Sequence, residues 1–448
     1  MSLTEDIAAH ACGLRFEKLP DVAVTAALTF TYDTLAVGAA GAGSPLAAKV
    51  LDTVRRWDDG YEANVLGDGE EFSAPGVAFA NAFLIHCQEY DCVHEPAVVH
   101  PMATVLAAVL AEAQRLGDVV GPDFLAAIVA AVDVAAGLGV AAQSPLKFFR
   151  PATAGVFGAT AGIARLRGYA SPQLLSAWGL ALTQASGTMQ AHVEGKPALA
   201  LQVANAARAA HYACDLTDAG LEGPTDALAG PYGYLTLFED EADLTAGFKG
   251  MGETFRITEV SHKAYPTGRA AQGGLWALER LIEAGLPLDR LERLTLEAPP
   301  LIGRLVGREA TRGMSANQAR LCFPYLAARM LRHGIGLDAF TDHALGDDRT
   351  MMLAANIAVT RADGAANAFT PQTLTAALTG GETMRQRVDA LPGSPGLPLT
   401  RQQQDDKAAA CLAFGAPGAE AGALREAVWA LPESRDAGAI ALQAVGKT

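Results

Sequence analysis

Cysteine is scarce in this sequence, and its spacing excludes several classes of protein. The chain of 448 residues has six cysteines, none of which forms a CxxC pair or joins histidines at zinc-finger spacing. The same spacing does not provide the ligand pattern of an iron–sulfur cluster. We therefore expect buried, reduced thiols in a cytoplasmic protein.

Positive charge is also in short supply. The chain has 34 Lys and Arg against 49 Asp and Glu, which gives a net charge of -15. Binding to nucleic-acid phosphates needs a basic surface, so we expect no nucleic-acid partner. Residues 1–30 lack the basic segment and apolar run of a signal peptide, and we expect none.

One apolar run is long enough to raise the question of a membrane span. Residues 124–142 are almost entirely apolar, and a run of about 18 such residues can cross a bilayer. Asp133 lies in the middle of the run, and many of its residues are small. We expect a buried core helix and no membrane partner.

The pattern of apolar residues predicts a mainly helical protein. Residues 1–265 are rich in Ala and Leu, and their apolar side chains recur three and four positions apart. The sequence pattern then changes. A helix is predicted over 270–283, and the segments 293–297 and 356–360, in which apolar and polar residues alternate, are typical of strands. This second region has the features of a smaller α+β domain.

A Pro- and Gly-rich run over 391–398 ends the second region. Thr400 and Gln403 then have the spacing of a capping box, which predicts another helix. We therefore predict a helical domain over 1–265, an α+β domain over 266–398, and a return to the helical domain over 399–448.

The densest chemistry lies between positions 86 and 100. Three of the nine histidines and three carboxylates fall within these fifteen residues. Histidine titrates nearest to physiological pH, so the cluster favours acid–base catalysis. A metal site is a weaker interpretation because the spacing matches no standard signature such as HExxH. The alternative without function is that these side chains only cap helices and pair with neighbours.

Three prolines follow a basic side chain, in the pairs His100-Pro101, Arg150-Pro151 and Lys196-Pro197. Proline is favoured at the first helical position, so each pair predicts a helix with the basic residue as its N-cap. A helix N-terminus is positively polarised, and a cation there has the wrong sign unless an anion neutralises it. The pairs predict a small-anion site, or they arise by chance among 34 basic residues and 23 prolines.

Five motifs follow one another along the chain: Asn81-Ala82 through His100-Pro101, Phe149-Arg150-Pro151, Gly195-Lys196-Pro197 with Asn205 to Arg208, Val260 to Pro266, and Phe323-Pro324-Tyr325. In order and spacing they resemble the 2-methylcitrate dehydratase family, also called MmgE/PrpD. That family includes cis-aconitate decarboxylase and iminodisuccinate epimerase. The resemblance extends over nearly the whole chain.

The resemblance implies a two-domain fold, mainly α, in which an α+β lid domain is inserted into a helical domain, commonly as a homodimer. It also implies a small di- or tricarboxylate substrate, bound in a basic pocket without a metal or organic cofactor. The catalytic residues expected on this basis are His100, Lys263, Tyr325, Glu89 and His94. The expected substrate-binding residues are Arg150, Lys196, Asp91 and Tyr265.

Within that set the base is expected to be His100, ranked first, or a lysine whose pKa is lowered by cationic neighbours. We expect Tyr325 or a protonated His94 to return a proton or assist the leaving group. Arg150 departs from the family pattern because a histidine usually stands there, and arginine cannot exchange a proton at working pH. We expect Arg150 to clamp an anion instead.

The leading interpretation is a lyase that resembles 2-methylcitrate dehydratase and removes a proton next to a carboxylate. The alternatives are an epimerase of a dicarboxylate like iminodisuccinate epimerase, a decarboxylase like cis-aconitate decarboxylase, and an inactive homologue that only binds carboxylates.

Overall fold

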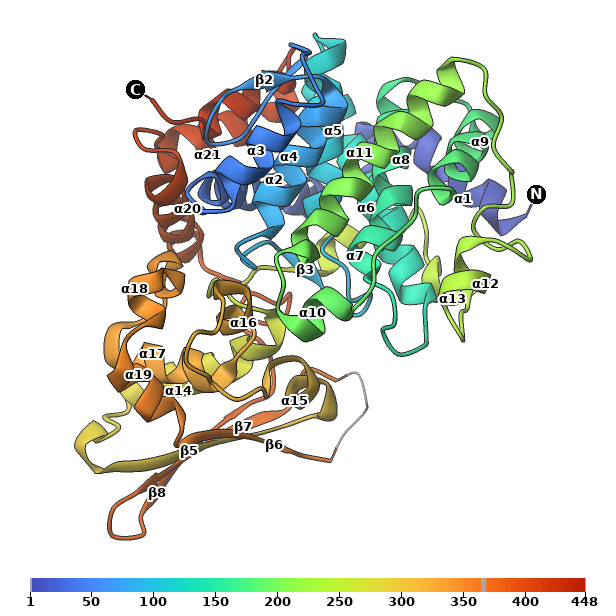
Figure 1. Cartoon of the computed structure of the whole chain (residues 1–448). Coiled ribbons are helices and arrows are strands. Elements are labelled where there is room, and N and C mark those ends of the chain that lie inside the picture. The colour runs from blue at the N-terminus through green and yellow to red at the C-terminus, as the bar shows by residue number, and fades with distance from the viewer. Residues whose placement is uncertain (1, 364–367, 448) are drawn as a thin grey trace. The chain divides into compact units, whose positions relative to one another are not determined.

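A computed structural model describes residues 2–363 and 368–447, which form two compact units (Figure 1). The helical unit comprises residues 1–189, 198–261 and 400–448, and the mixed unit comprises 190–197 and 262–399. Two details differ from the expected division. The first boundary lies after Ser261, and residues 190–197, which contain Lys196, belong to the mixed unit.

The helical unit is built from helices of very different length. Its principal helices are α1 (Leu3–Gly13), α2 (Asp21–Ala42), α3 (Ala47–Val54), α4 (Ala74–His86), α5 (Pro101–Leu116), α6 (Gly121–Ala141), α8 (Gly155–Leu166), α9 (Ser171–Leu182), α11 (Ala198–Asp218), α20 (Arg401–Gly415) and α21 (Ala421–Trp429). The shorter ones are α7 (Arg150–Thr153), α12 (Tyr234–Phe238) and α13 (Leu244–Gly247). The predicted, predominantly helical character of this part of the chain is confirmed.

Glycines let the central helices approach closely. A Cβ atom on Gly158 of α8 would lie 2.6 Å from the carbonyl oxygen of Ala131 in α6. A Cβ on Gly162 would lie 2.5 Å from Cγ2 of Val109 in α5. Real Cβ atoms do not come this close, so both positions require glycine for the helices to pack at this distance.

The long apolar helix predicted around Asp133 is α6. By length and composition, α2 and α6 are both long and apolar enough to cross a membrane, but 94% of the apolar window of α6 is buried inside the protein. Asp133 is also buried, and its carboxylate accepts hydrogen bonds from His10 and from the backbone N–H of Arg256. These features are those expected of a core helix.

Helices α4 and α5 pack against each other and bring the ends of the histidine-rich segment together. Helix α4 begins after the N-cap Ser73, is buried along its whole length and ends at His86. Helix α5 begins at Pro101 with His100 as its N-cap, as predicted. Between them, β3 (Val93–His94) pairs antiparallel with β4 (Val260–Ser261).

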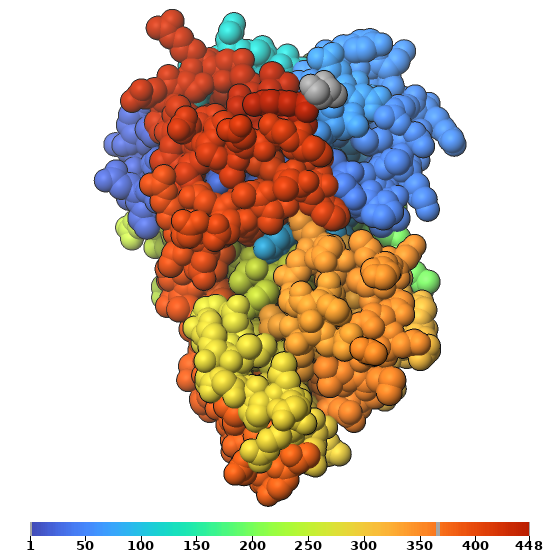
Figure 2. Space-filling view, turned by 90° about the vertical axis from the view of Figure 1, so that its left-hand side faces the viewer, coloured from blue at the N-terminus to red at the C-terminus, as the bar shows by residue number. Residues whose placement is uncertain are grey.

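The C-terminal segment returns to the helical unit, as the capping box indicated. The Thr400 side chain accepts from the N–H of Gln403, whose own side chain accepts from the N–H of Thr400. Helix α20 packs on α2, and α21 packs beside it. Figure 2 shows this segment, in red, spread over one face of the helical unit.

The mixed unit contains a four-stranded sheet in the order β6-β5-β7-β8. Strand β5 (Leu291–Ala298) pairs parallel with β6 (Ile357–Arg361) and antiparallel with β7 (Gln372–Leu378), which pairs antiparallel with β8 (Thr383–Val388). Both predicted strands are confirmed, and β7 and β8 are additional. The helices of this unit are α10 (Gln190–Glu194), α14 (Gln272–Glu283), α15 (Pro300–Val306), α16 (Ala316–Arg320), α17 (Phe323–His333), α18 (Asp342–Leu345) and α19 (Asp348–Ala354).

Candidate active site

Two histidines and one aspartate form a compact cluster in the helical unit, here called the His–Asp–His cluster (His86, Asp91 and His100). Oδ2 of Asp91 lies 2.9 Å from Nδ1 of His86 and 2.9 Å from Nδ1 of His100. The imidazole rings meet edge to face, with centroids 4.8 Å apart. Asp91 has no exposed surface, and the His86 ring is almost as deeply buried.

This geometry determines which nitrogen of each imidazole can act as a base. A carboxylate accepts hydrogen bonds when it is ionised, so with Asp91 ionised both Nδ1 atoms are the donors. In a neutral ring the other nitrogen, Nε2, then carries the lone pair. The His100 side chain is 14% exposed and that of His86 is 1% exposed, so His100 is the member of the cluster that solvent reaches.

Glu89 lies in the turn that follows α4, within the segment that leads to α5. Its φ is 53°, in the left-handed region that is uncommon for residues other than glycine. Oε1 of Glu89 lies 3.9 Å from Nε2 of His86, and the side chain is mostly buried. Strained backbone of this kind persists only where surrounding contacts enforce it, and it gathers at functional sites.

His94 is fully buried and already has a partner on each ring nitrogen. Its Nδ1 accepts from the backbone N–H of Ala97 at 3.2 Å, and its Nε2 lies 2.8 Å from Oε2 of Glu259. This hydrogen bond is the main cause that lowers the pKa of Glu259 to about 2, with Arg256 contributing. These contacts hold β3 in place, and the catalytic role of His94 stays a prediction without geometric support.

Arg150 is buried in an ion pair within the helical unit. Its Nε and Nη2 donate to the two carboxylate oxygens of Glu239 at 2.9 and 2.8 Å, and Nη2 also donates to the carbonyl of Ser144. Arg150 is also the first residue of a four-residue helix after Phe149, so the prediction that it is an N-cap is wrong. Because Glu239 neutralises its charge, the anion-clamping role predicted for Arg150 has no support from this geometry.

Lys196 belongs to the mixed unit and is exposed. It lies between α10 and α11, so it is not an N-cap either. The φ of the preceding Gly195 is +62°, and a Cβ there would lie 2.3 Å from Cγ of Gln318. The carbonyl of Gly195 accepts from the hydroxyl of Ser315 at 3.1 Å, which fixes this loop on the start of α16.

Lys263 and Tyr265 lie in the mixed unit on a loop clamped by Gln272. The side-chain oxygen of Gln272 accepts from the N–H groups of Ala264 and Tyr265, and its nitrogen donates to the Tyr265 carbonyl. Lys263 has no exposed surface. The Tyr265 hydroxyl donates to Glu279 at 3.0 Å, and burial raises the pKa of Tyr265.

Tyr325 is buried in the core of the mixed unit, near the start of α17. Its hydroxyl donates to the carbonyl of Ala339 at 2.5 Å, and burial raises its pKa to about 12. Both effects oppose proton exchange near neutral pH. The proton-returning role of Tyr325 therefore stays a prediction that this geometry does not favour.

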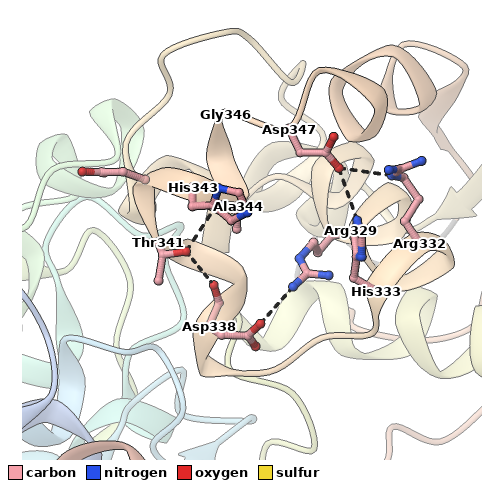
Figure 3. A pocket seen from close by; sticks show the side chains of 10 residues that line it. Arg329, Arg332, His333, Asp338, Thr341, His343, Ala344, Gly346 and Asp347 are labelled. Atoms are coloured by element: carbon pink, nitrogen blue, oxygen red, sulfur yellow. Dashed lines mark hydrogen bonds and ion pairs between the residues drawn. The ribbon is translucent and has the colours of Figure 1, made fainter.

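The mixed unit also has a cavity of about 650 Å³ next to the C-terminal end of α17 (Figure 3). Its charged side chains pair with one another: Arg329 with Asp338 at 3.0 Å, and Arg332 with Asp347 at 3.2 Å. None of the predicted site residues lines this cavity. It is therefore separate from the expected chemistry.

Among the residues that the structure describes, the His–Asp–His cluster is also a group of side chains that could hold a metal. One potential ligand atom from each residue lies within 4.8 Å of the others, and imidazole with carboxylate is a common zinc or iron set. In the observed geometry, however, both Nδ1 atoms lie at hydrogen-bond distance from the same carboxylate oxygen. Hydrogen bonds alone account for this arrangement.

Fold and site together define a two-unit protein, mostly helical, with a buried histidine–carboxylate cluster. The MmgE/PrpD N-terminal domain family matches residues 5–246, and the MmgE/PrpD C-terminal domain family matches residues 265–433. The chain therefore belongs to the MmgE/PrpD family, a family of enzymes, and the resemblance inferred from the motifs is confirmed.

Two fungal relatives are similar to this chain at low identity. The cis-aconitate decarboxylase-like protein oryM of Aspergillus oryzae is 27% identical over 381 residues, which covers 79% of this chain and 78% of that protein. The cis-aconitate decarboxylase of Aspergillus terreus is 26% identical over 297 residues, which covers 62% of this chain and 60% of that enzyme.

Sequence reasoning did not assign roles to His86, Glu239 or Glu259. His86 belongs to the histidine-rich segment 86–100, and its position five residues before Asp91 was the one local sign that the two side chains could interact. The partners of Arg150 and His94 lie 89 and 165 residues away in the chain. Pairing over such distances has no signature in a single sequence.

Proposed function

We propose that this protein is a lyase, independent of metal and organic cofactors, that acts on a small di- or tricarboxylate. His100 is the acid–base group and Asp91 is its charged support. The observation that carries the proposal is that one oxygen of the fully buried Asp91, Oδ2, lies 2.9 Å from Nδ1 of both histidines. A buried carboxylate in this position orients the imidazole and stabilises the positive charge that forms on it.

In elimination, Nε2 of His100 takes a proton from the carbon next to a carboxylate. The C–H electron pair moves onto that carboxylate and then forms the double bond as the β-hydroxyl takes the proton from the His100 imidazolium and leaves as water, which returns His100 to its neutral form. In decarboxylation, the imidazolium of His100 gives its proton to carbon as the C–CO₂ bond breaks. Both reactions need the same imidazole, placed by Asp91 and able to change its protonation state.

The carboxylates of the substrate need cations. We assign this role to Lys196 and Lys263, as the resemblance implies, because both remain candidates after Arg150 is removed. Arg150 is left out because Glu239 binds it through both carboxylate oxygens. Cations next to a developing carbanion stabilise the transition state more than the ground state.

The relatives make cis-aconitate the first substrate to test and decarboxylation the first reaction. Dehydration of 2-methylcitrate comes next, and epimerisation of iminodisuccinate after it. The mixed unit as a lid, a homodimeric assembly and a cytoplasmic location belong to the same proposal.

Proton NMR in deuterated water distinguishes these reactions. The purified protein is incubated with cis-aconitate, 2-methylcitrate and iminodisuccinate in turn. New vinyl signals indicate decarboxylation or dehydration, and deuterium entry next to a carboxylate with an unchanged skeleton indicates epimerisation. An absence of turnover and of thermal stabilisation across this panel would contradict the proposed substrate class.

A further inference from the structure

The returning C-terminal helix α20 carries a buried lysine that reaches the turn of the candidate site. Lys407 is only 7% exposed, and its Nζ lies 2.8 Å from Oδ1 of Asp33 in α2. The same Nζ donates to the backbone carbonyl of Tyr90 at 3.0 Å. It also lies 4.1 Å from the centroid of the Tyr90 ring.

These contacts use the ammonium group fully. Lysine has three N–H donors: one acceptor here is a carboxylate, another is a carbonyl, and the aromatic face offers a cation–π contact. Asp33 is 5% exposed, so both members of the pair are shielded from water. A shielded ion pair bonds more strongly to a carbonyl than an exposed one does.

The side chains around the pair are buried. Cys92 and Cys411 have no exposed surface, and burial raises the pKa of both thiols, with Asp33 raising and Lys407 lowering each pKa. An ion pair in such a place is costly to desolvate and is weak evidence for stability by itself. The hydrogen bond from Lys407 to the Tyr90 carbonyl suggests that the pair also positions the turn.

Tyr90 stands between the two residues of the turn that bear on the site. Glu89 precedes it with a φ of 53°, and Asp91 follows it as the bridge between His86 and His100. Fixing the Tyr90 carbonyl fixes the peptide plane that leads directly into Asp91. A backbone held in the left-handed region needs such external contacts to persist.

We propose that Lys407 is a positioning residue that holds the turn so that Asp91 can bridge both histidines, with Asp33 supplying its counter-charge. This inference rests on the proposed function for its effect on catalysis. Its structural part, the hold on the turn, can be measured without any substrate. It also gives the C-terminal return of the chain a function in the site.

The test uses a double variant, Asp33→Asn with Lys407→Met. Both replacements are close in size to the original side chains. Together they leave no unpaired buried charge, which would destabilise the folded protein. The matched control is Asp405→Asn with Arg425→Met. Asp405 stands on the same helix, and its ion pair with Arg425 of α21 has an N–O distance of 2.5 Å but does not contact the turn.

The first readout is hydrogen exchange of a peptide covering residues 87–94, followed by mass spectrometry. The amide of Glu89 donates to the carbonyl of His86 at 3.0 Å, so it reports on opening of the turn. We expect at least tenfold faster exchange in the Asp33/Lys407 variant and exchange within twofold of wild type in the control. Equal exchange in wild type and the Asp33/Lys407 variant would overturn the proposal.

The second readout is steady-state kinetics on whichever carboxylate the wild type converts. We expect kcat to fall at least tenfold with KM within threefold, because the substrate cations are untouched. A kcat within twofold of wild type would overturn the proposal. If no carboxylate is converted, the proposed function fails while the exchange measurement still decides the role of Lys407. If that double variant does not fold, Asp33→Asn with Lys407→Leu, which also leaves no unpaired buried charge, carries both readouts with the same criteria.

Discussion

Replacing Asp91 with Asn removes one charge from the His–Asp–His cluster and almost no volume. In the wild type, Oδ2 of Asp91 lies at a hydrogen-bond distance of 2.9 Å from Nδ1 of His86 and from Nδ1 of His100. In the variant, an amide oxygen at that place can still accept both bonds but carries no charge. An amide nitrogen there would instead force both rings into the tautomer in which Nε2 is protonated and cannot act as a base.

The expected loss follows from the charge interaction. Unit charges about 4 Å apart interact by about 4 kcal/mol at an effective dielectric constant of about 20. This energy stabilises the His100 imidazolium that forms as the proton is transferred. Losing about 4 kcal/mol from the transition state corresponds to about a 1000-fold fall in kcat. The tautomer effect would add to this figure.

The assay compares kcat of wild type and Asp91→Asn on the substrate identified by NMR, with thermal unfolding as a check on the fold. The matched control is Asp133→Asn. Asp133 is similarly buried in the helical unit and lies 3.0 Å from a histidine nitrogen, that of His10, outside the cluster. We expect the control to lose about 1–3 kcal/mol of stability and to keep its kcat. A kcat for Asp91→Asn within tenfold of wild type would refute the reasoning.

Three further predictions concern the Glu259–His94 contact, the Arg150–Glu239 ion pair and the removal of metal. Folding lowers the pKa of Glu259 from 4.5 to about 2, chiefly because of its hydrogen bond with His94. The ionised Glu259 carboxylate therefore stabilises the folded protein above pH 4.5, and this stabilisation is lost as the pH falls towards 2. Glu259→Gln should make stability in urea less dependent on pH in that window by about 1 kcal/mol after solvent screening, and an unchanged dependence would contradict this. Arg150→Met leaves Glu239 buried and unpaired, which should cost about 3–5 kcal/mol in chemical denaturation. Adding Glu239→Gln should recover most of that loss, and a cost below about 1 kcal/mol for the single change would show that the pair is not formed. Dialysis against a chelator should leave kcat unchanged, whereas loss of activity that zinc restores would assign a metal to the His–Asp–His cluster.

Local signals in the sequence predicted much of the fold. The apolar periodicity of residues 1–265, the N-cap position of His100 and the capping box at Thr400 are patterns of near neighbours, and each is confirmed. Strand β8 escaped prediction because most of its side chains are polar and half of them are exposed. Strand β7 alternates buried and half-buried side chains, and that local signal was missed. The rule that predicted His100 as an N-cap failed at Arg150 and Lys196. Proline favours the start of a helix without fixing its first residue: α7 begins one residue before Pro151, and α11 begins one residue after Pro197.

The candidate site was predictable only in part. The sequence singled out the segment that contains Asp91 and His100, because dense titratable residues are visible without a structure. It could not show that Arg150 has a buried carboxylate partner, that the Tyr325 hydroxyl is bonded to a carbonyl, or that Lys407 reaches the turn from 317 residues away. Such contacts depend on tertiary packing between distant segments.

The most direct test of the central claim is His100→Gln, measured beside wild type by proton NMR with cis-aconitate and then with 2-methylcitrate and iminodisuccinate. His100 is the cluster member with an exposed edge, and glutamine can neither take nor give a proton at neutral pH. We predict turnover by wild type and none by the variant, with unchanged thermal unfolding. Turnover by a folded variant within tenfold of wild type would contradict it.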